Sequence, residues 1–227
     1  MNLNPEPNQI HHIFIFSTVG IPLVNFLRQL GLDCTNPQIN SVTEISSTLI
    51  FFENVFIEFF LVENINHPEV DDLSNELDFF YRSDWLRTEA SPFGFGLSYK
   101  TKLNGEIKTN TLENILRLNF LLGSFINLNE PICYVVADYI ANRNRLNRTL
   151  TINNNNTSQN LGIRRLTHVK LSLKSTRTVT TPLLNLTRQN ILDIEYGKIP
   201  LLELTFDYNA QKKLLDLRPL VPIIFKY

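Results

Sequence analysis

The sequence has little of what several classes of protein require. Its 227 residues include 21 basic and 22 acidic side chains, so no net field of one sign would steer the chain onto nucleic acid or an anionic membrane. No apolar run approaches the roughly 20 residues that span a bilayer. Residues 1–7 lack the basic, apolar and small-residue order of a signal peptide. We therefore expect a cytoplasmic protein without a nucleic-acid or membrane partner.

Cysteine and histidine are also scarce. Cys34 and Cys133 are the only cysteines of the chain, and in a reducing compartment this pair predicts two free thiols rather than a disulfide. The chain has only four histidines, so a histidine that recurs at one place in a repeated pattern is informative.

The sequence does contain an internal repeat. A strand-like run that opens on histidine occurs at residues 11–17 and again at 167–173, and His12 and His168 are 168 − 12 = 156 residues apart. Each run is followed by an amphipathic helix pattern, at 22–30 and 182–190, with Pro, Leu, Asn, Arg and Gln in the same places. A strand-like run with a central glutamate follows in each half. The repeated order predicts a duplicated unit of His-strand, helix and Glu-strand.

The first unit supplies the clearest chemical signal. Residues 47–52 and 55–62 predict a β-hairpin, with a tight turn between them. Glu58 is the sole charge among the apolar residues of the second strand, and a buried carboxylate is costly unless it is paired, hydrogen-bonded or bound to a cation. In the His-strand, alternation places His12 on one face with Phe14 and puts His11 on the other.

The rest of the chain predicts a helix near residues 73–81, strands at 91–99 and 131–139, and an exposed asparagine-rich loop at 142–160. The apolar tail at 222–227 predicts a strand added to a sheet edge. Four aromatic residues are candidates for lining a substrate pocket, although aromatic residues in strands more often belong to a core: Trp85, Phe93, Phe95 and Tyr99. His11 and His67 have no counterpart in the other unit, which favours surface or structural roles for both.

Two histidines and two glutamates at equivalent places of a duplicated unit converge if the units pair about a twofold axis. The candidate ligands are His12, Glu58, His168 and Glu203. Imidazole nitrogens and carboxylate oxygens form a mixed set that suits a divalent metal such as Zn, Ni, Fe, Co or Mn. The alternative is that each residue is an ordinary member of its strand.

These four residues resemble the ligand set of the vicinal oxygen chelate superfamily, which includes glyoxalases, extradiol dioxygenases and bleomycin-resistance proteins. The resemblance implies an α+β fold in which paired βαβββ modules form a curved mixed sheet, with metal ligands on the first and last strands of each module. The segments at 90–94, 162–167 and 216–219 are similar to a group of bacterial glyoxalase-like proteins. The chain would then divide into a first module at 8–64, a connecting insertion at 65–161 and a second module at 162–227.

The resemblance leaves three functions open. The first is a metal-dependent lyase or isomerase acting on a small oxygen-chelating substrate, with Glu58 or Glu203 as the catalytic base. The second is a metal-free protein that sequesters an apolar or aromatic small molecule, as bleomycin-resistance proteins do. The third is an iron enzyme of the extradiol dioxygenase type, with His12, His168 and Glu203 as ligands. The expected partner is a small molecule in each case, and a homodimer stays open.

Overall fold

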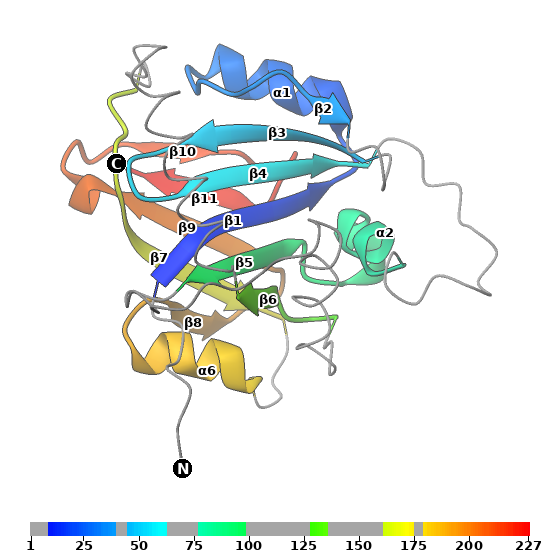
Figure 1. The fold of residues 1–227 in the computed structure, drawn as a ribbon, viewed down its shortest axis with the longest axis vertical. Coiled ribbons are helices and arrows are strands. Elements are labelled where there is room, and N and C mark those ends of the chain that lie inside the picture. Colours follow the sequence, from blue (N-terminus) through cyan, green and yellow to red (C-terminus); the bar gives the residue numbers. More distant parts are fainter. Residues whose placement is uncertain (1–8, 40–44, 63–76, 99–127, 136–160, 175–178) are drawn as a thin grey trace, which may run out of the picture.

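The computed structural model describes residues 9–39, 45–62, 77–98, 128–135, 161–174 and 179–227. These residues form an α+β fold with two mixed sheets, here called sheet A and sheet B, which are seen one in front of the other in Figure 1. The predicted α+β class is therefore confirmed.

Sheet A runs in the order β2-β3-β4-β1-β5-β6. Its strands are β1 (Gln9–Ser17), β2 (Gln38–Ile39), β3 (Ser46–Phe51), β4 (Phe56–Leu61), β5 (Phe93–Ser98) and β6 (Ile132–Val135). Sheet B runs in the order β10-β11-β9-β7-β8. Its strands are β7 (Leu166–Leu173), β8 (Asp193–Tyr196), β9 (Leu201–Phe206), β10 (Leu214–Asp216) and β11 (Ile223–Lys226). The helices are α1 (Gly20–Gln29), α2 (Leu77–Ser83), α3 (Trp85–Thr88), α6 (Thr181–Arg188) and the 3₁₀ turn η1 (Asp207–Asn209).

Helix α1 forms where the 3.6-residue period predicts it. Leu23, Val24 and Leu27 lie on one face and are buried. The helix ends before Gly31, whose φ of 87° is the left-handed conformation that commonly terminates a helix. Helix α6 repeats this pattern after β7, with a proline in its first turn. Both predicted helices are therefore confirmed.

The core contains residues from both sheets and both of these helices. Ile13, Ile15, Ile57 and Phe59 are fully buried on one face of sheet A, and burial of each such side chain contributes about 1.5–3 kcal/mol. Phe52, just after β3, packs against Phe206 of sheet B with 4.5 Å between ring centroids. The two sheets therefore share one core.

A four-stranded unit occurs in both sheets. In the unit β4-β1-β5-β6, the outer strands run parallel to their inner neighbours and the two inner strands run antiparallel to each other. The unit β8-β7-β9-β11 has the same directions in the same sequence order. Helices α1 and α6 lie on the equivalent crossovers. The predicted repeat of His-strand and helix is therefore present in the strand topology.

Additional strands extend these two units. Strands β2 and β3 continue sheet A beyond β4, and β3 and β4 form the predicted hairpin. Residues 9–61 accordingly have the element order βαβββ. In sheet B, β10 pairs with β11. The tail strand β11 therefore lies between β10 and β9, and its predicted place at a sheet edge is wrong.

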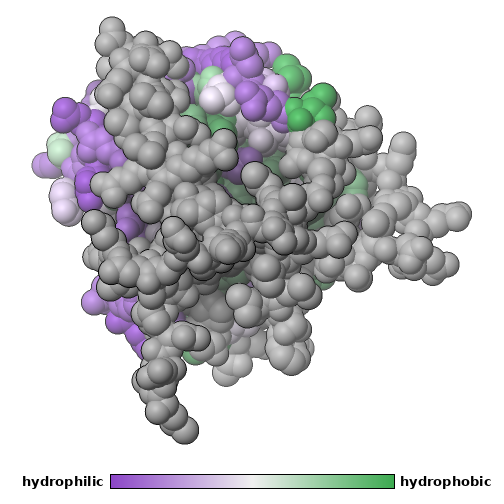
Figure 2. Space-filling model, viewed as in Figure 1, coloured by the Kyte–Doolittle hydropathy of each residue, from purple (hydrophilic) through white to green (hydrophobic). Residues whose placement is uncertain are grey.

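On the side of the molecule seen in Figure 2, hydrophilic residues cluster at the top, around α1, and along the left margin. The helices within the described ranges are all too short or too polar to cross a membrane.

Candidate functional site

A β-bulge in β1 places two histidines side by side. Against β5, Ile10 pairs with Leu97 and His12 pairs with Gly96, so His11 is an extra residue in the ladder. His11 Nδ1 and His12 Nδ1 are 2.9 Å apart, and both rings contact Phe56. Alternation predicted opposite faces for the two histidines, and this prediction is wrong because the bulge interrupts the two-residue period. A surface or structural role was expected for His11, and burial of its side chain excludes the surface position.

The two histidines belong to an aromatic face of sheet A. We call it the His12 face, and it comprises His11, His12, Phe14, Phe16, Phe56, Glu58 and Phe60. His12, Phe14 and Phe16 of β1 pair in register with Phe56, Glu58 and Phe60 of β4. His12 stacks on Phe56 with ring centroids 4.7 Å apart and an interplanar angle of 3°. Phe16 stacks on Phe60 at 5.3 Å. The side chains of the opposite face belong to the shared core. His12, Phe14 and Phe16 are also buried, but they lie outside that core cluster.

Glu58 is the carboxylate of this face. It lies opposite Phe14 in the ladder, two residues from both Phe56 and Phe60, and is partly buried. Burial raises the pKa of Glu58, and a hydrogen bond with the Ser47 side chain opposes that rise. Within the described part of the chain, no cationic side chain is close enough to contribute to its pKa. Among the residues that the structure describes, Glu58 therefore has no positive charge that compensates its burial.

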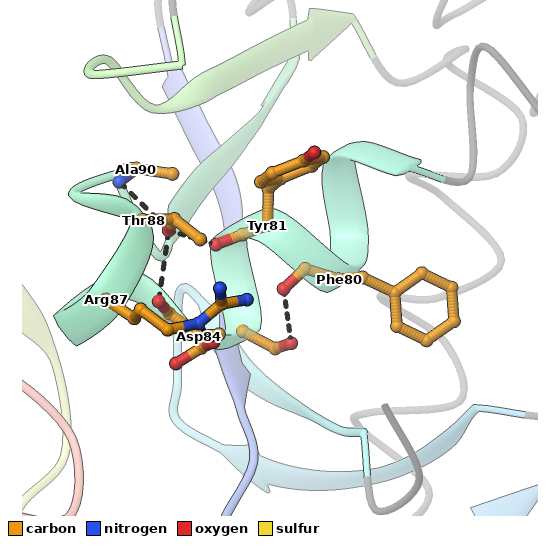
Figure 3. A network of polar contacts seen from close by, with 7 residues as sticks. Phe80, Tyr81, Asp84, Arg87, Thr88 and Ala90 are labelled. Carbon is orange, nitrogen blue, oxygen red and sulfur yellow. Dashed lines mark hydrogen bonds and ion pairs between the residues drawn. The ribbon is translucent and has the colours of Figure 1, made fainter. Parts of the chain in front are cut away.

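Helix α2 packs against one end of the His12 face. Phe79 stacks on Phe16 with ring centroids 5.1 Å apart. The corner between α2 and α3 is held by Thr88, whose hydroxyl donates to the Tyr81 and Asp84 carbonyls, and by an ion pair between Arg87 and Asp84 (Figure 3). This corner fixes the exit of α2 and leads into β5.

The other two predicted ligands lie on sheet B and have partners there. His168 Nε2 is 3.3 Å from Asp193 Oδ2. Glu203 is ion-paired with Lys226, and Lys170 Nζ lies 3.9 Å from its other carboxylate oxygen. Lys170 also pairs with Glu195 at 2.7 Å. We call this charged surface the His168 face.

The strand pairing confirms that His12 and His168 are equivalent, but it does not make Glu58 and Glu203 equivalent. The bulge recurs in β7 at Thr167, so His168 is equivalent to His12. Strand β4, which carries Glu58, is parallel to β1, whereas β9, which carries Glu203, is antiparallel to β7. Two residues beyond each histidine, Phe14 pairs with Glu58 and Lys170 pairs with Asp193. The expectation that Glu203 is the counterpart of Glu58 is therefore wrong, and Asp193 takes that place.

The described arrangement does not favour one shared ion among the four predicted ligands. Glu203 lies between two ammonium groups, which compete with any cation for its oxygens. Within the described ranges, no three His, Cys, Asp or Glu side chains lie close enough together to hold a metal ion. His12 and Glu58 share the His12 face, while His168 and Glu203 belong to the other sheet. Binding of a divalent metal stays a prediction.

The predicted pocket aromatics have different positions. Phe93 and Phe95 are fully buried in the core, whereas Trp85 is partly buried at the start of α3. Tyr99 and His67 lie outside the described residues. Sequence reasoning missed His11 and Phe56 as members of the candidate site. The adjacent pair of histidines was the only signal for His11, and alternation pointed away from it.

Comparison with known proteins gives no further assignment, since no family model and no curated protein matches the chain.

Proposed function

We propose that the chain binds an apolar, aromatic small molecule on the His12 face, within a fold of the vicinal oxygen chelate type. The observation that carries the proposal is Glu58, a carboxylate set among aromatic rings without a compensating cation in the described residues. Small-molecule sites combine apolar walls with a few polar groups that orient the ligand. A ring with a hydrogen-bond donor or a positive charge fits this combination, because the rings pack against it and Glu58 accepts from it.

The βαβββ order of residues 9–61 supports the fold assignment, and the repeated four-stranded unit supports a paired arrangement. The two repeated units differ in the side chains that surround their carboxylates. The His168 face carries cross-strand ion pairs, so its carboxylates already have partners. The ligand site is therefore assigned to sheet A alone.

A second candidate is a metal-dependent lyase or isomerase. It is supported by His12 and Glu58, one nitrogen and one oxygen ligand on adjacent strands of the same face. A bound metal would supply Lewis-acid stabilisation of a developing oxyanion. In that case Glu58 would hold the ion or accept a proton from the substrate, and the aromatic rings would exclude water.

Thermal melts with simple probes separate the two candidates. Benzylamine carries a ring and a cationic donor, and benzoate carries the same ring with a carboxylate. We expect benzylamine to stabilise the wild type by on the order of 1.4 kcal/mol at ten times its Kd. We expect benzoate to stabilise the wild type less than benzylamine does. In Glu58→Gln, the two compounds should stabilise the protein equally. Zn²⁺, Ni²⁺ and Mn²⁺ are added separately. Stabilisation by a metal ion alone would favour the second candidate, and no effect of any probe would contradict both.

A further inference from the structure

Two glycines of β5 lie directly beneath aromatic rings of the His12 face. Gly96 pairs with His12 and Gly94 pairs with Phe14 in the antiparallel ladder. A Cβ atom on Gly96 would lie 2.1 Å from His12 Cε1, and one on Gly94 would lie 1.9 Å from Phe14 Cζ. Non-bonded carbon atoms prefer about 3.5–4.0 Å, so neither ring could keep its place above a larger residue.

The backbone conformation does not explain these glycines. The glycines with positive φ among the described residues are Gly20, Gly31 and Gly162, so neither Gly94 nor Gly96 adopts the left-handed conformation. Glycine in a strand interior weakens the strand and often marks a close approach by another group.

The repeat supplies an internal comparison. In sheet B, His168 pairs with Thr205 and Lys170 pairs with Glu203, at the positions equivalent to Gly96 and Gly94. The same ladder geometry therefore accommodates a β-branched residue and a long charged residue. Sheet A differs because the His12 and Phe14 rings lie over β5, in the space that a side chain at Gly96 or Gly94 would occupy.

The position of the His12 ring determines its contacts with Phe56 and His11. His12 stacks on Phe56 and contacts His11 through Nδ1. Movement of the ring away from Gly96 would change both contacts, because all three groups meet on one side of β1. The space above Gly96 thus determines where the imidazole presents its nitrogens.

We infer that Gly96 is a positioning residue that holds the His12 ring in place on the His12 face, and that Gly94 does the same for Phe14. The importance of this for ligand binding rests on the proposed function. The packing relationship itself can be tested without any ligand.

A double-mutant cycle between Gly96 and His12 tests the packing. Gly96→Ala should lower the melting temperature by roughly 3–10 °C, as expected for an overpacked site. Gly197→Ala is the matched control, because the nearest atoms to its added Cβ would be 3.5 and 3.6 Å away. In a His12→Ala background, Gly96→Ala should cost no more than Gly197→Ala. An equal loss from Gly96→Ala with and without the His12 ring would overturn the inference. The His12→Ala background also keeps the comparison measurable if the single Gly96→Ala variant does not fold.

A spectroscopic readout distinguishes positioning from a general loss of stability. The His12 ring protons lie against the face of Phe56 and should show an upfield ring-current shift in the ¹H–¹³C NMR spectrum of the wild type. Gly96→Ala should remove that shift and weaken benzylamine binding by about tenfold, while Gly197→Ala should change neither. An unchanged His12 resonance in Gly96→Ala would reject the positioning role. Absence of benzylamine binding by the wild type would reject the proposed function instead, and the cycle would still decide the role of Gly96.

Discussion

Replacement of Glu58 by glutamine should stabilise the protein near neutral pH. Burial raises the pKa of Glu58 above its ordinary value of 4.5, despite the hydrogen bond with Ser47. The folded state therefore binds this proton more tightly than the unfolded state does. As the pH rises from the unfolded pKa through the folded pKa, stability is lost, and above the folded pKa the loss is constant. Glutamine keeps the size and an acceptor for Ser47 but cannot ionise.

The size of the effect follows from the same linkage. Each unit by which the pKa is raised corresponds to about 1.4 kcal/mol of destabilisation above the folded pKa. We expect Glu58→Gln to be more stable than the wild type at pH 7.5 by this amount for each unit of the shift, and each 1 kcal/mol corresponds to about 2–4 °C in Tm for a domain of this size. At pH 4 the protonated wild type and the variant should be nearly equal in stability.

Urea unfolding of both proteins at pH 4 and pH 7.5 measures this difference directly. Glu53→Gln is a matched control, because its side chain is 52% exposed at the β3–β4 turn and its removal should change stability little at either pH. A Glu58→Gln variant that is less stable than wild type at pH 7.5 would refute the reasoning. So would a gain that is the same at both pH values.

Two further predictions concern other buried polar groups. Glu130 Oε2 accepts hydrogen bonds from the backbone N–H and hydroxyl of Thr180, which occupies the N-cap position of α6, so Glu130→Gln should cost about 1–2 kcal/mol, or roughly 2–8 °C in Tm. Thermal melts check this, and a loss no larger than that of Glu53→Gln would contradict a stabilising role for these two hydrogen bonds. Burial raises the pKa of the Cys133 thiol to about 12 and also raises that of Cys34, so both thiols should react slowly with iodoacetamide at pH 8 until urea unfolds the chain. Rapid alkylation of the folded protein would contradict this prediction.

Local patterns predicted the elements that depend on local physics. The period of Leu23 and Leu27, followed by Gly31, is sufficient to mark α1, because a buried stripe and a left-handed terminus are both encoded within a few residues. The 156-residue offset between His12 and His168 also holds in the ladder, down to the bulge that precedes each histidine.

The bulge itself could not be predicted from residue types. A strand with His11 and His12 in succession reads as ordinary alternation, and no glycine or proline marks the extra residue. The insertion becomes visible only when β5 is paired with β1. His11 therefore belongs to the candidate site because of the pairing between β1 and β5, which are far apart in the sequence. The residues around His11 alone do not predict that pairing.

Strand direction was the other missing information. The apolar runs around Glu58 and Glu203 look alike, since each places a glutamate within a buried strand. Strand β4, which carries Glu58, follows β3 in a hairpin and runs parallel to β1, whereas β9, which carries Glu203, follows β8 and runs antiparallel to β7. The similarity of the two runs reflects burial, which any core strand shows, rather than an equivalent place in the fold.

The divergence of the two copies explains why the site is assigned to sheet A. Where the His12 face has Phe14 opposite Gly94, the His168 face has Lys170 opposite Glu203, so an aromatic ring over a glycine corresponds to an ion pair across two strands. Charges on the His168 face therefore neutralise one another at a partly exposed surface, where such pairs contribute little to stability. On the His12 face, burial disfavours the ionised form of Glu58, and the described residues supply no cation that offsets its loss of hydration. A ligand that donates to Glu58 would reverse this loss, whereas nothing comparable is gained by a ligand at Glu203.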